Sequence, residues 1–503
     1  MLEPNGERRA PRQRPPMRPP TRAAIAADSP LTVQAGLRIA EAGGNAVDIA
    51  VAAAVAATLA EILMASLGGS GFLMLDLPGQ PSELIEGADA VPAGPGDGSP
   101  PAWWVVHLPY GDGITVRAGP ASVAVPGLPA ALHLAWSRHG SLPWRELLAP
   151  ALEMARTGTP MGRTTALWLS IAGTLLFDRQ AASRACFPVD PADPPRPGRL
   201  MRLPGLADSL ELLAAEGAEA FYRGALAEAF AAEMAATGGL VTRRDLAAYR
   251  AQVRQPLVLA SGGFHLDLNP PPAVGGLALA SLIRLLERDP APANEAARTR
   301  RRVEAQRRLA RLRPHLGPLR SPHTTHLSVA TADGALVAVT MSNGYGSGIT
   351  IPGTGIPCNN SLGEPELNPL GFLAAEPGAR MVSNMAPTLA RHPDGRRYAF
   401  GTPGASRITT AMAQVWERHT LEGLPLAEAI DAPRLHLQSD CDPPLLLCEP
   451  GLDLSALDPE LTVRCFAGPD MYFGGIKVAG RSADGNLVAH ADRRREGAVA
   501  FSG

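Results

Sequence analysis

The stretch "SPHTTHLSVATADGALVAVTMSN", which runs from Ser321 to Asn343, decides how the rest of the chain is interpreted. Two runs within it, "THLSVAT" and "ALVAVTMS", are rich in β-branched and apolar residues. The sequence Ala332-Asp333-Gly334 between them is typical of a tight turn, so we predict a β-hairpin. Two adjacent threonines, Thr324 and Thr325, stand at its head between two histidines. This placement needs a physical reason.

Two ordinary interpretations of the His-Thr-Thr-His sequence come first. Threonine is a common strand residue, so the pair can simply belong to the strand. Histidines three positions apart also resemble zinc ligands, but residues alternate between the faces of a strand, so His323 and His326 would point in opposite directions. The chain also lacks the HExxH pattern of zinc hydrolases. We therefore expect no metal site.

The third interpretation is chemical. A threonine hydroxyl is a weak nucleophile near neutral pH unless a base lies beside it. If the chain is cut before Thr324, the new α-amine, with an ordinary pKa of roughly 7.7–8.0, supplies that base. The same hydroxyl could make the cut by attacking the carbonyl of His323, while N–H groups of glycine-rich loops stabilise the oxyanion. The hairpin alone leaves the strand and the nucleophile interpretations open.

The overall composition excludes several classes of protein. The chain has 503 residues, too many for one ordinary core but suitable for one large two-part fold. Its net charge is 46 − 48 = −2, so no global field attracts nucleic acid or an anionic membrane. Hydrophobic residues make up 46% and charged residues 19%, as in globular proteins. The 5 cysteines are odd in number and lack a CxxC pair, which argues against a disulfide framework or a zinc knuckle.

The N-terminal sequence and the most apolar run bear on location. "MLEPNGERRAPRQRPPMRPPTR" is rich in proline and arginine and has no apolar core of a signal peptide, so we expect residues 1–23 to form a disordered tail. The run "AVDIAVAAAVAATLAEILMASLGG" has only about a dozen residues between Asp48 and Glu61, too few to span a bilayer. We predict a buried helix there and a soluble, cytoplasmic protein without nucleic-acid or membrane partners.

Local signals place several elements near the N-terminus. Ser29 can cap a helix that has Pro30 at its first position, and Asn45 can cap a second helix with Asp48 in its first turn. The run "GFLMLDLP", residues 71–78, reads as a buried strand.

The segment 298–320, "RTRRRVEAQRRLARLRPHLGPLR", is rich in arginine. A basic run can bind phosphate, but this one has no interleaved aromatic residues for stacking on bases. We therefore predict a solvated helix followed by an exposed linker, where a chain tolerates being cut.

A series of sequence blocks, taken in order, carries a resemblance to a known family. The blocks are AGGNAVD (42–48), LGGSGFLML (67–75), EGAEAFYRGALAEAF (216–230), GGLVTRRDLAAY (238–249), NPPPAVGG (269–276), TTHLSV (324–329), GTPGASRI (401–408) and RRREGAVA (493–500). From about Ala24 to its end, the chain resembles the γ-glutamyltranspeptidase family. The resemblance implies the four-layer αββα sandwich of N-terminal-nucleophile hydrolases. It also implies self-cleavage between His323 and Thr324, giving a large subunit (24–323) and a small subunit (324–503).

The resemblance also assigns roles to residues of this sequence. Thr324 aligns with the nucleophile. Ser342, favoured over Met341 because it carries a hydroxyl, lies in the region of the threonine that helps to activate it. Gly404 and Ala405 align with the pair whose backbone N–H groups form the oxyanion hole. Substrate-binding roles fall to four residues: Asn343 for the amino-acid end, Glu364 for the α-amine, and Ser383 and Asn384 for the α-carboxylate.

Three positions depart from the pattern of the family. The family has an arginine that pairs with the α-carboxylate of the substrate, and "EGADAVP" places Ala88 there. Alanine cannot replace a bidentate arginine–carboxylate pair, although Arg117 or an arginine of the linker could substitute for it. Glu364 stands where aspartate is usual, and Ser361 where glutamine or glutamate is common. Acyl transfer through Thr324 is therefore better supported than recognition of a γ-glutamyl group.

The resemblance implies a γ-glutamyltransferase or glutathione hydrolase. Such an enzyme would take the acyl group of a small γ-glutamyl amide onto Thr324 and pass it to water or an amine. One alternative is a related amidohydrolase for another amide, of the oxamate or cephalosporin-acylase type. Another is an inactive homologue that only binds. We expect no metal or organic cofactor, because the terminal amine and backbone donors suffice.

Overall fold

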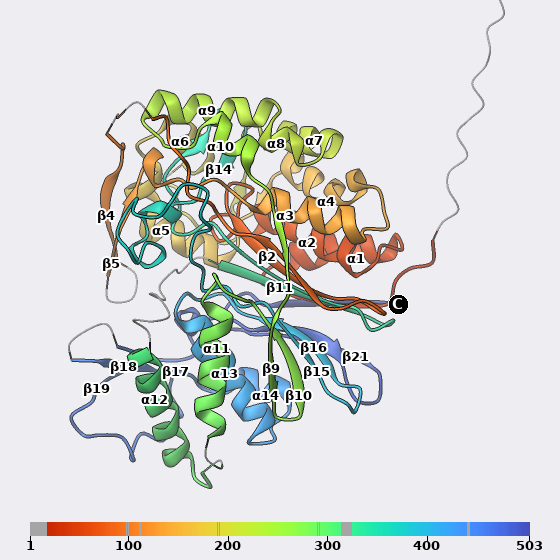
Figure 1. Ribbon diagram of the computed structural model, residues 1–503, viewed down its shortest axis with the longest axis vertical. Coiled ribbons are helices and arrows are strands. Elements are labelled where there is room, and N and C mark those ends of the chain that lie inside the picture. Colours follow the sequence, from red (N-terminus) through yellow and green to blue (C-terminus); the bar gives the residue numbers. More distant parts are fainter. Residues whose placement is uncertain are drawn as a thin grey trace, which may run out of the picture.

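The computed structural model describes residues 18–312 and 324–503, apart from 97, 99, 110–112, 189, 191, 289, 291 and 440–442. Two β-sheets lie face to face, and helices cover the outer face of each (Figure 1). The predicted four-layer αββα sandwich is confirmed by this arrangement. Apolar side chains from both sheets form the layer between them, including Phe72, Ala338, Leu389 and Ala479.

The first sheet has seven strands and contains the hairpin. Its spatial order is β22 (Ala498–Ser502), β1 (Ala23–Ala27), β11 (Thr324–Thr331), β12 (Leu336–Ser342), β2 (Ser70–Asp76), β3 (Glu83–Gly87) and β8 (Gln252–Arg254). The second sheet has six strands: β21 (Leu487–Ala491), β20 (Lys477–Arg481), β16 (Arg397–Gly401), β15 (Thr388–Arg391), β10 (Phe264–Leu268) and β9 (Leu257–Ser261).

The helices next to the first sheet are α1 (Pro30–Glu41), α2 (Ala46–Ala60) and α3 (Leu128–His139), and α4 (Trp144–Thr157) packs against α2 and α1. Farther out lie α5 (Arg163–Phe177), α6 (Ala181–Cys186), α7 (Leu206–Glu216), α8 (Glu219–Tyr222), α9 (Ala225–Thr237) and α10 (Arg243–Ala248). The second sheet carries α11 (Gly275–Glu287), α13 (Arg407–Thr420) and α14 (Leu426–Asp431), with α12 (Glu295–Leu312) packed beside α11. Small sheets combine β4 (Trp104–Leu108) with β5 (Ile114–Ala118), β6 (Thr159–Pro160) with β7 (Leu200–Met201), β13 (Thr350–Ile351) with β14 (Ile356–Pro357), and β17 (Leu435–Gln438) with β18 (Leu445–Cys448) and β19 (Thr462–Cys465).

The predicted hairpin is confirmed in full. Strands β11 and β12 pair antiparallel from Thr324 opposite Ser342 to Ala330 opposite Leu336. Every residue of both strands is buried, since β11 lies between β1 and β12, and β12 between β11 and β2. The pairing with β1 extends only from Ser328 to Thr331, so the head of the hairpin at Thr324 is paired with β12 alone.

The two N-terminal helix caps were also predicted correctly. The Ser29 hydroxyl accepts a hydrogen bond from the N–H of Leu31 (3.2 Å), and the Asn45 side chain accepts from Val47 and Asp48 (both 3.0 Å). Every residue of α2 is buried, as the apolar run suggested. None of the helices in the described ranges combines the length and the apolar character that a bilayer crossing requires.

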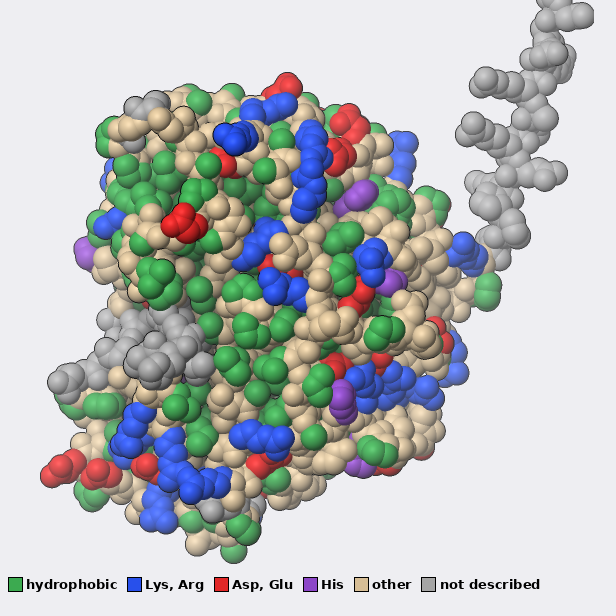
Figure 2. All heavy atoms as spheres, in the orientation of Figure 1, with side chains coloured by type: hydrophobic (Ala, Val, Ile, Leu, Met, Phe, Trp, Pro, Cys, Tyr) green, Lys and Arg blue, Asp and Glu red, His purple; other side chains and the backbone are tan. Residues whose placement is uncertain are grey.

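The structure bears on two predictions for basic segments, the disordered tail at residues 1–23 and the solvated helix in the segment 298–320. Most of the predicted tail lies outside the described residues, but its last residue, Ala23, already pairs in β1. The helix predicted in the arginine-rich segment exists as α12, and basic side chains gather on the surface around it in Figure 2. It is not uniformly solvated, however. Arg302 is only 1% exposed and pairs with Glu295, Glu417 and Glu422, because these carboxylates offset the cost of burying it.

Candidate active site

Thr324, the first residue of β11, lines a narrow pocket and is itself only 1% exposed. The free space in the pocket is about 20 Å³, enough for about one water molecule. Its walls come from β2, from the segment after β3, from the end of β12, from the segment before β15 and from the first turn of α13. The lining residues are Ser70, Phe72, Ala88, Asp89, Thr324, Ser342, Gly344, Ser361, Leu367, Met381, Val382, Ser383, Asn384, Met385 and Ile408.

Ser342 lies directly across the hairpin from Thr324. Opposite residues of an antiparallel pair point to the same face of the sheet, so both side chains reach the pocket. The Ser342 hydroxyl accepts a hydrogen bond from the N–H of Gly344 (3.2 Å), which fixes its oxygen at the strand end. The register thus places Ser342, and not Met341, opposite Thr324, and the predicted role of Ser342 stays a prediction.

A second pair of segments forms the opposite wall. The N–H of Val91 donates to Ala379 (2.9 Å), and the N–H of Met381 donates to Asp89 (2.8 Å), so the two segments run side by side. This pairing brings Ser383 and Asn384 to the pocket. The Ser383 hydroxyl accepts from the N–H of Met385 (3.2 Å), whereas neither polar atom of the Asn384 side chain has a hydrogen-bond partner among the described residues.

Asp89 is a pocket residue that the sequence reasoning missed. It is 3% exposed, and its Oδ2 accepts a hydrogen bond from the hydroxyl of Ser361 (2.6 Å). Burial raises the pKa of Asp89 to about 7, although hydrogen bonds from Ser361 and Ser70 act in the opposite direction. The available signal was its place in "EGADAVP", directly after a buried strand and beside Ala88.

The loop after β16 holds Gly404 and Ala405 just before α13. Gly404 has φ 132°, and Ala405 has φ 60°, a left-handed conformation that costs an alanine about 1 kcal/mol or more. Within the described part of the chain, neither N–H donates a hydrogen bond. Both therefore remain available near the positive end of the α13 dipole, which suits an oxyanion. Ile408, in the first turn of α13, places this loop next to the pocket.

Two of the predicted substrate-binding residues do not line the pocket. Asn343 is fully buried, and its side-chain N–H donates to the carbonyl of Cys358 (3.4 Å). Glu364 is also fully buried and lies behind Gly344, where its carboxylate accepts from the N–H of Tyr345 (3.3 Å). Both contact the loop that forms one side of the site, and their predicted contact with substrate stays a prediction.

Ala88 does line the pocket, so the missing arginine leaves a gap in the wall where a cation was expected. Arg117, the suggested substitute, is not among the lining residues. Its guanidinium stacks on the rings of Trp103 (4.3 Å) and Phe372 (3.9 Å). A carboxylate in the pocket would therefore meet no basic side chain from the described lining residues.

The other face of β11 is very different. The Thr325 hydroxyl lies within hydrogen-bond distance of Asp28 (3.1 Å) and of Glu61, and Asp28 forms an ion pair with Lys477. Thr32 also donates to Glu61 (2.6 Å). Burial and the nearby Asp28 raise the pKa of Glu61 above its usual range, while burial lowers the pKa of Lys477 despite its partner. This group, which we call the buried ion cluster, ties the ends of β1 and α2 and the start of β20 to the strand of the nucleophile.

The sequence reasoning also missed the buried ion cluster, although one signal was present. Lys477 is the only lysine of the chain, and it is 0% exposed. A lone lysine in an arginine-rich protein suggests a place where the compact ammonium is needed. Gly475 allows it, because a Cβ at that position would lie 3.1 Å from the ammonium nitrogen of Lys477.

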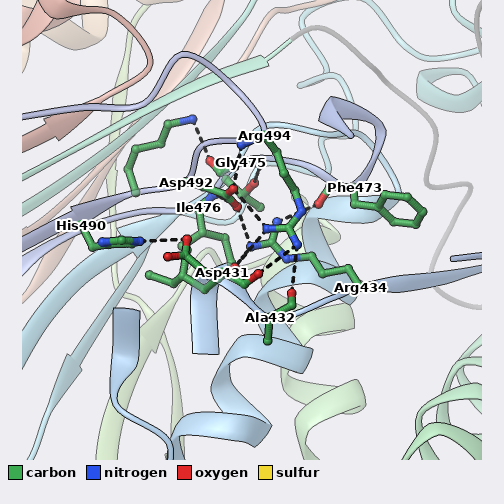
Figure 3. Close-up of polar contacts among 12 residues, drawn as sticks. Asp431, Ala432, Arg434, Phe473, Gly475, Ile476, His490, Asp492 and Arg494 are labelled. Carbon is green, nitrogen blue, oxygen red and sulfur yellow. Dashed lines mark hydrogen bonds and ion pairs between the residues drawn. The ribbon is translucent and has the colours of Figure 1, made fainter. Parts of the chain in front are cut away.

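Arg495 connects the C-terminal region to the nucleophile. Its guanidinium donates a hydrogen bond to the carbonyl oxygen of Thr324 (3.3 Å). The preceding residue, Arg494, is held by Glu449 (2.5 Å) and by Asp492 (3.2 Å), and Asp492 also pairs with Arg434 (2.5 Å), as Figure 3 shows in part. Burial would raise the pKa of Asp492, but the two arginines hold it below its usual value. These pairs fix the loop that carries Arg495.

The sequence profile of the gamma-glutamyltranspeptidase family matches residues 32–317 and 317–502. The chain belongs to this family. The enzyme class of the chain is an amide hydrolase or transferase of the N-terminal-nucleophile type.

Relatives within this group differ in their names. The chain is 28% identical over 482 residues to the glutathione hydrolase proenzyme of Escherichia coli, which covers 82% of this chain and 80% of that one. It is 29% identical over 539 residues to the acylase ACY 1 proenzyme of Pseudomonas sp. (strain V22), with 96% and 94% covered. A crystal structure of cephalosporin acylase from Bacillus halodurans has the same fold, with a TM-score of 0.79, 24% identity and 99% of each chain covered. Both of these relatives are named as proenzymes.

Proposed function

We propose that the chain cuts itself between His323 and Thr324, and that Thr324 then transfers the acyl group of a γ-glutamyl amide to water or to an amine. The observation that carries this proposal is the position of Thr324 at the head of β11, in a narrow pocket and opposite Ser342. His323 lies outside the described residues. Cytoplasmic action on a glutathione-like amide is part of the same proposal.

The chemistry follows from the groups around Thr324. The free α-amine takes the proton of the hydroxyl as the oxygen attacks the carbonyl carbon of the donor. The N–H groups of Gly404 and Ala405 receive the oxyanion, which stabilises the tetrahedral intermediate. The amine then returns the proton to the leaving nitrogen, and an ester remains on Thr324. Water or a second amine, deprotonated by the same α-amine, cleaves the ester and releases the acyl group.

Two groups support the nucleophile without touching substrate. Arg495 holds the carbonyl of Thr324, and the buried ion cluster holds the hydroxyl of Thr325. Together they restrain the backbone on which the new terminus would form, and a small misplacement of a nucleophile lowers rates strongly.

A second candidate function is hydrolysis of an amide whose acyl group lacks the α-carboxylate. The observation that favours it is Ala88 in the wall of the pocket, with no basic side chain among the described lining residues. The match to an acylase over nearly the whole chain supports the same candidate.

Mass spectrometry and N-terminal sequencing of the purified protein test the proposal. We expect two fragments, with the small one starting at Thr324. Thr324→Ala should give one uncut chain without activity, because the methyl group cannot attack. Thr331→Ala, on the same strand but at the turn of the hairpin, is the matched control and should be cut normally. An active protein that remains a single chain across residues 323 and 324 would refute the proposal.

A further inference from the structure

The pocket around Thr324 holds one ionisable side chain, Asp89, and no basic one among its described lining residues. The carboxyl of Asp89 is buried beside the hydroxyl of Ser361. Burial makes this carboxyl costly to ionise, so a cation that enters the pocket would stabilise its charged form.

Asn384 gives an independent sign of a ligand. Its side chain is 3% exposed, lines the same pocket, and has neither a donor for its Oδ1 nor an acceptor for its Nδ2 among the described residues. A buried polar group without a partner costs about 1–3 kcal/mol, so such a group in a pocket indicates a site for polar atoms of a ligand. Oδ1 can accept from an ammonium, and Nδ2 can donate to a carbonyl.

The cations nearest to this site are already engaged. Arg380, whose charge lowers the pKa of Asp89, contacts Glu86 (3.4 Å), donates to the carbonyl of Arg250 and covers the ring of Tyr249 (4.3 Å). A carboxylate of a substrate would therefore be buried next to Asp89 without a cationic partner, which opposes its binding.

The remaining lining suits a short hydrocarbon chain. The side chains of Phe72, Leu367 and Ile408 are apolar. Those of Met381 and Met385, which also line the pocket, are apolar as well. The free space of about 20 Å³ makes the pocket narrow, which favours a slender donor. Methionine side chains are flexible enough to move aside.

We propose that Asp89 and the side-chain oxygen of Asn384 bind an ammonium at the far end of the acyl group, so that the preferred donors are amides of short ω-amino acids without an adjacent carboxylate. This inference rests on the proposed acyl transfer through Thr324 and names its substrate class. The apolar lining contacts the methylene groups between the ammonium and the reacting carbonyl.

Four 4-nitroanilides separate the contributions of the two charges: 4-aminobutyryl, γ-glutamyl, glutaryl and butyryl. We expect the 4-aminobutyryl compound to have the highest kcat/KM in the wild-type protein, about tenfold above the γ-glutamyl and butyryl compounds, and glutaryl the lowest. Asp89→Asn should lower kcat/KM for the two amine-bearing donors about tenfold to hundredfold and leave butyryl nearly unchanged.

Two more variants sharpen the test. Ala88→Arg should raise kcat/KM for the γ-glutamyl and glutaryl donors, because it supplies the missing partner of the carboxylate. Glu376→Gln, an exposed residue just before the pocket segment, removes the same charge as Asp89→Asn outside the pocket and is the control. The order of kcat/KM among the four donors in the wild-type protein tests the inference even if a variant fails to fold.

The possible results distinguish this inference from the proposed function. A chain that is cut before Thr324 but prefers γ-glutamyl, glutaryl or butyryl donors, or cleaves none of the four, overturns the inference alone. Equal losses for all four donors in Asp89→Asn also overturn it. A chain that is not cut and cleaves none of the four overturns the proposed function as well.

Discussion

The two adjacent threonines of β11 face opposite surroundings. Thr325 points into the buried ion cluster, where Asp28, Glu61 and Lys477 satisfy one another. Thr324 points into a pocket in which the amide of Asn384 has no partner among the described residues. The alternation of a strand thus separates a face that holds the backbone from a face that leaves polar groups for a ligand.

This difference shows how the fold divides stability from chemistry. Satisfied buried networks rigidify the structure around them, whereas unpaired buried groups cost free energy until a ligand arrives. Thr324, the proposed nucleophile, lies on the boundary, so its backbone gains rigidity from one side while its side chain faces the pocket on the other. Three measurements can break or sharpen this comparison, each made in the uncut Thr324→Ala chain.

The largest effect is expected for Lys477→Met. It leaves Asp28 and Glu61 as two buried acids without their cation, and breaking a buried ion pair costs about 3–5 kcal/mol. Urea unfolding should report this loss in the free energy of unfolding. Arg38→Met removes an exposed ion pair with Glu153 on α1, so it is the control and should lose much less. A loss below about 1 kcal/mol for Lys477→Met would show that the buried ion cluster does not support the strand.

The second effect is a pH dependence on the pocket side. The pKa of Asp89 rises from 3.8 to about 7 on folding, so the folded chain binds a proton that the unfolded chain has lost. Its contribution to stability is therefore complete below about pH 4 and is lost as the pH rises through 7, by up to about 1.4 kcal/mol per pH unit. Urea unfolding at several pH values should show a shallower decline for Asp89→Asn than for the parent. Identical slopes would contradict the raised pKa.

The smallest effect is expected at the predicted oxyanion loop. Ala405 has φ 60°, which glycine adopts without a steric penalty. Ala405→Gly should raise the free energy of unfolding by about 0.5–1 kcal/mol, because the relief of strain exceeds the entropy that glycine loses on folding. Thermal unfolding checks this, with Ala411→Gly inside α13 as a control that should destabilise the protein. Equal losses in both variants would mean that the loop is not strained.

The sequence was sufficient for features set by neighbouring residues. The alternation in β11 and β12, the caps at Ser29 and Asn45, and the position of Thr324 all depend on local patterns and were predicted correctly. Ordered family motifs extended this to the sandwich fold, which needs many distant pairings that no local pattern reveals.

The missed residues depend on contacts between distant segments. Thr325 and Glu61 are 264 positions apart, and Arg302 meets Glu417 across 115 positions, so neither buried pair has a local signature. Asp89 was not predicted as a pocket residue, because the argument from "EGADAVP" concerned only the arginine that Ala88 replaces. Its buried neighbours become visible only when the segments around Asp89 and Met381 pair.

The order of the first sheet has a consequence for the working life of the enzyme. A cut before Thr324 would leave β1 from one polypeptide between β22 and β11 from the other, and β2 against β12. The cut would then break none of the strand pairs of this sheet. Unfolding of the cut protein, however, would release two separate polypeptides into solution. Melting would depend on dilution, because the two polypeptides must meet again before they can refold. A molecule cut in this way could no longer refold as a single chain.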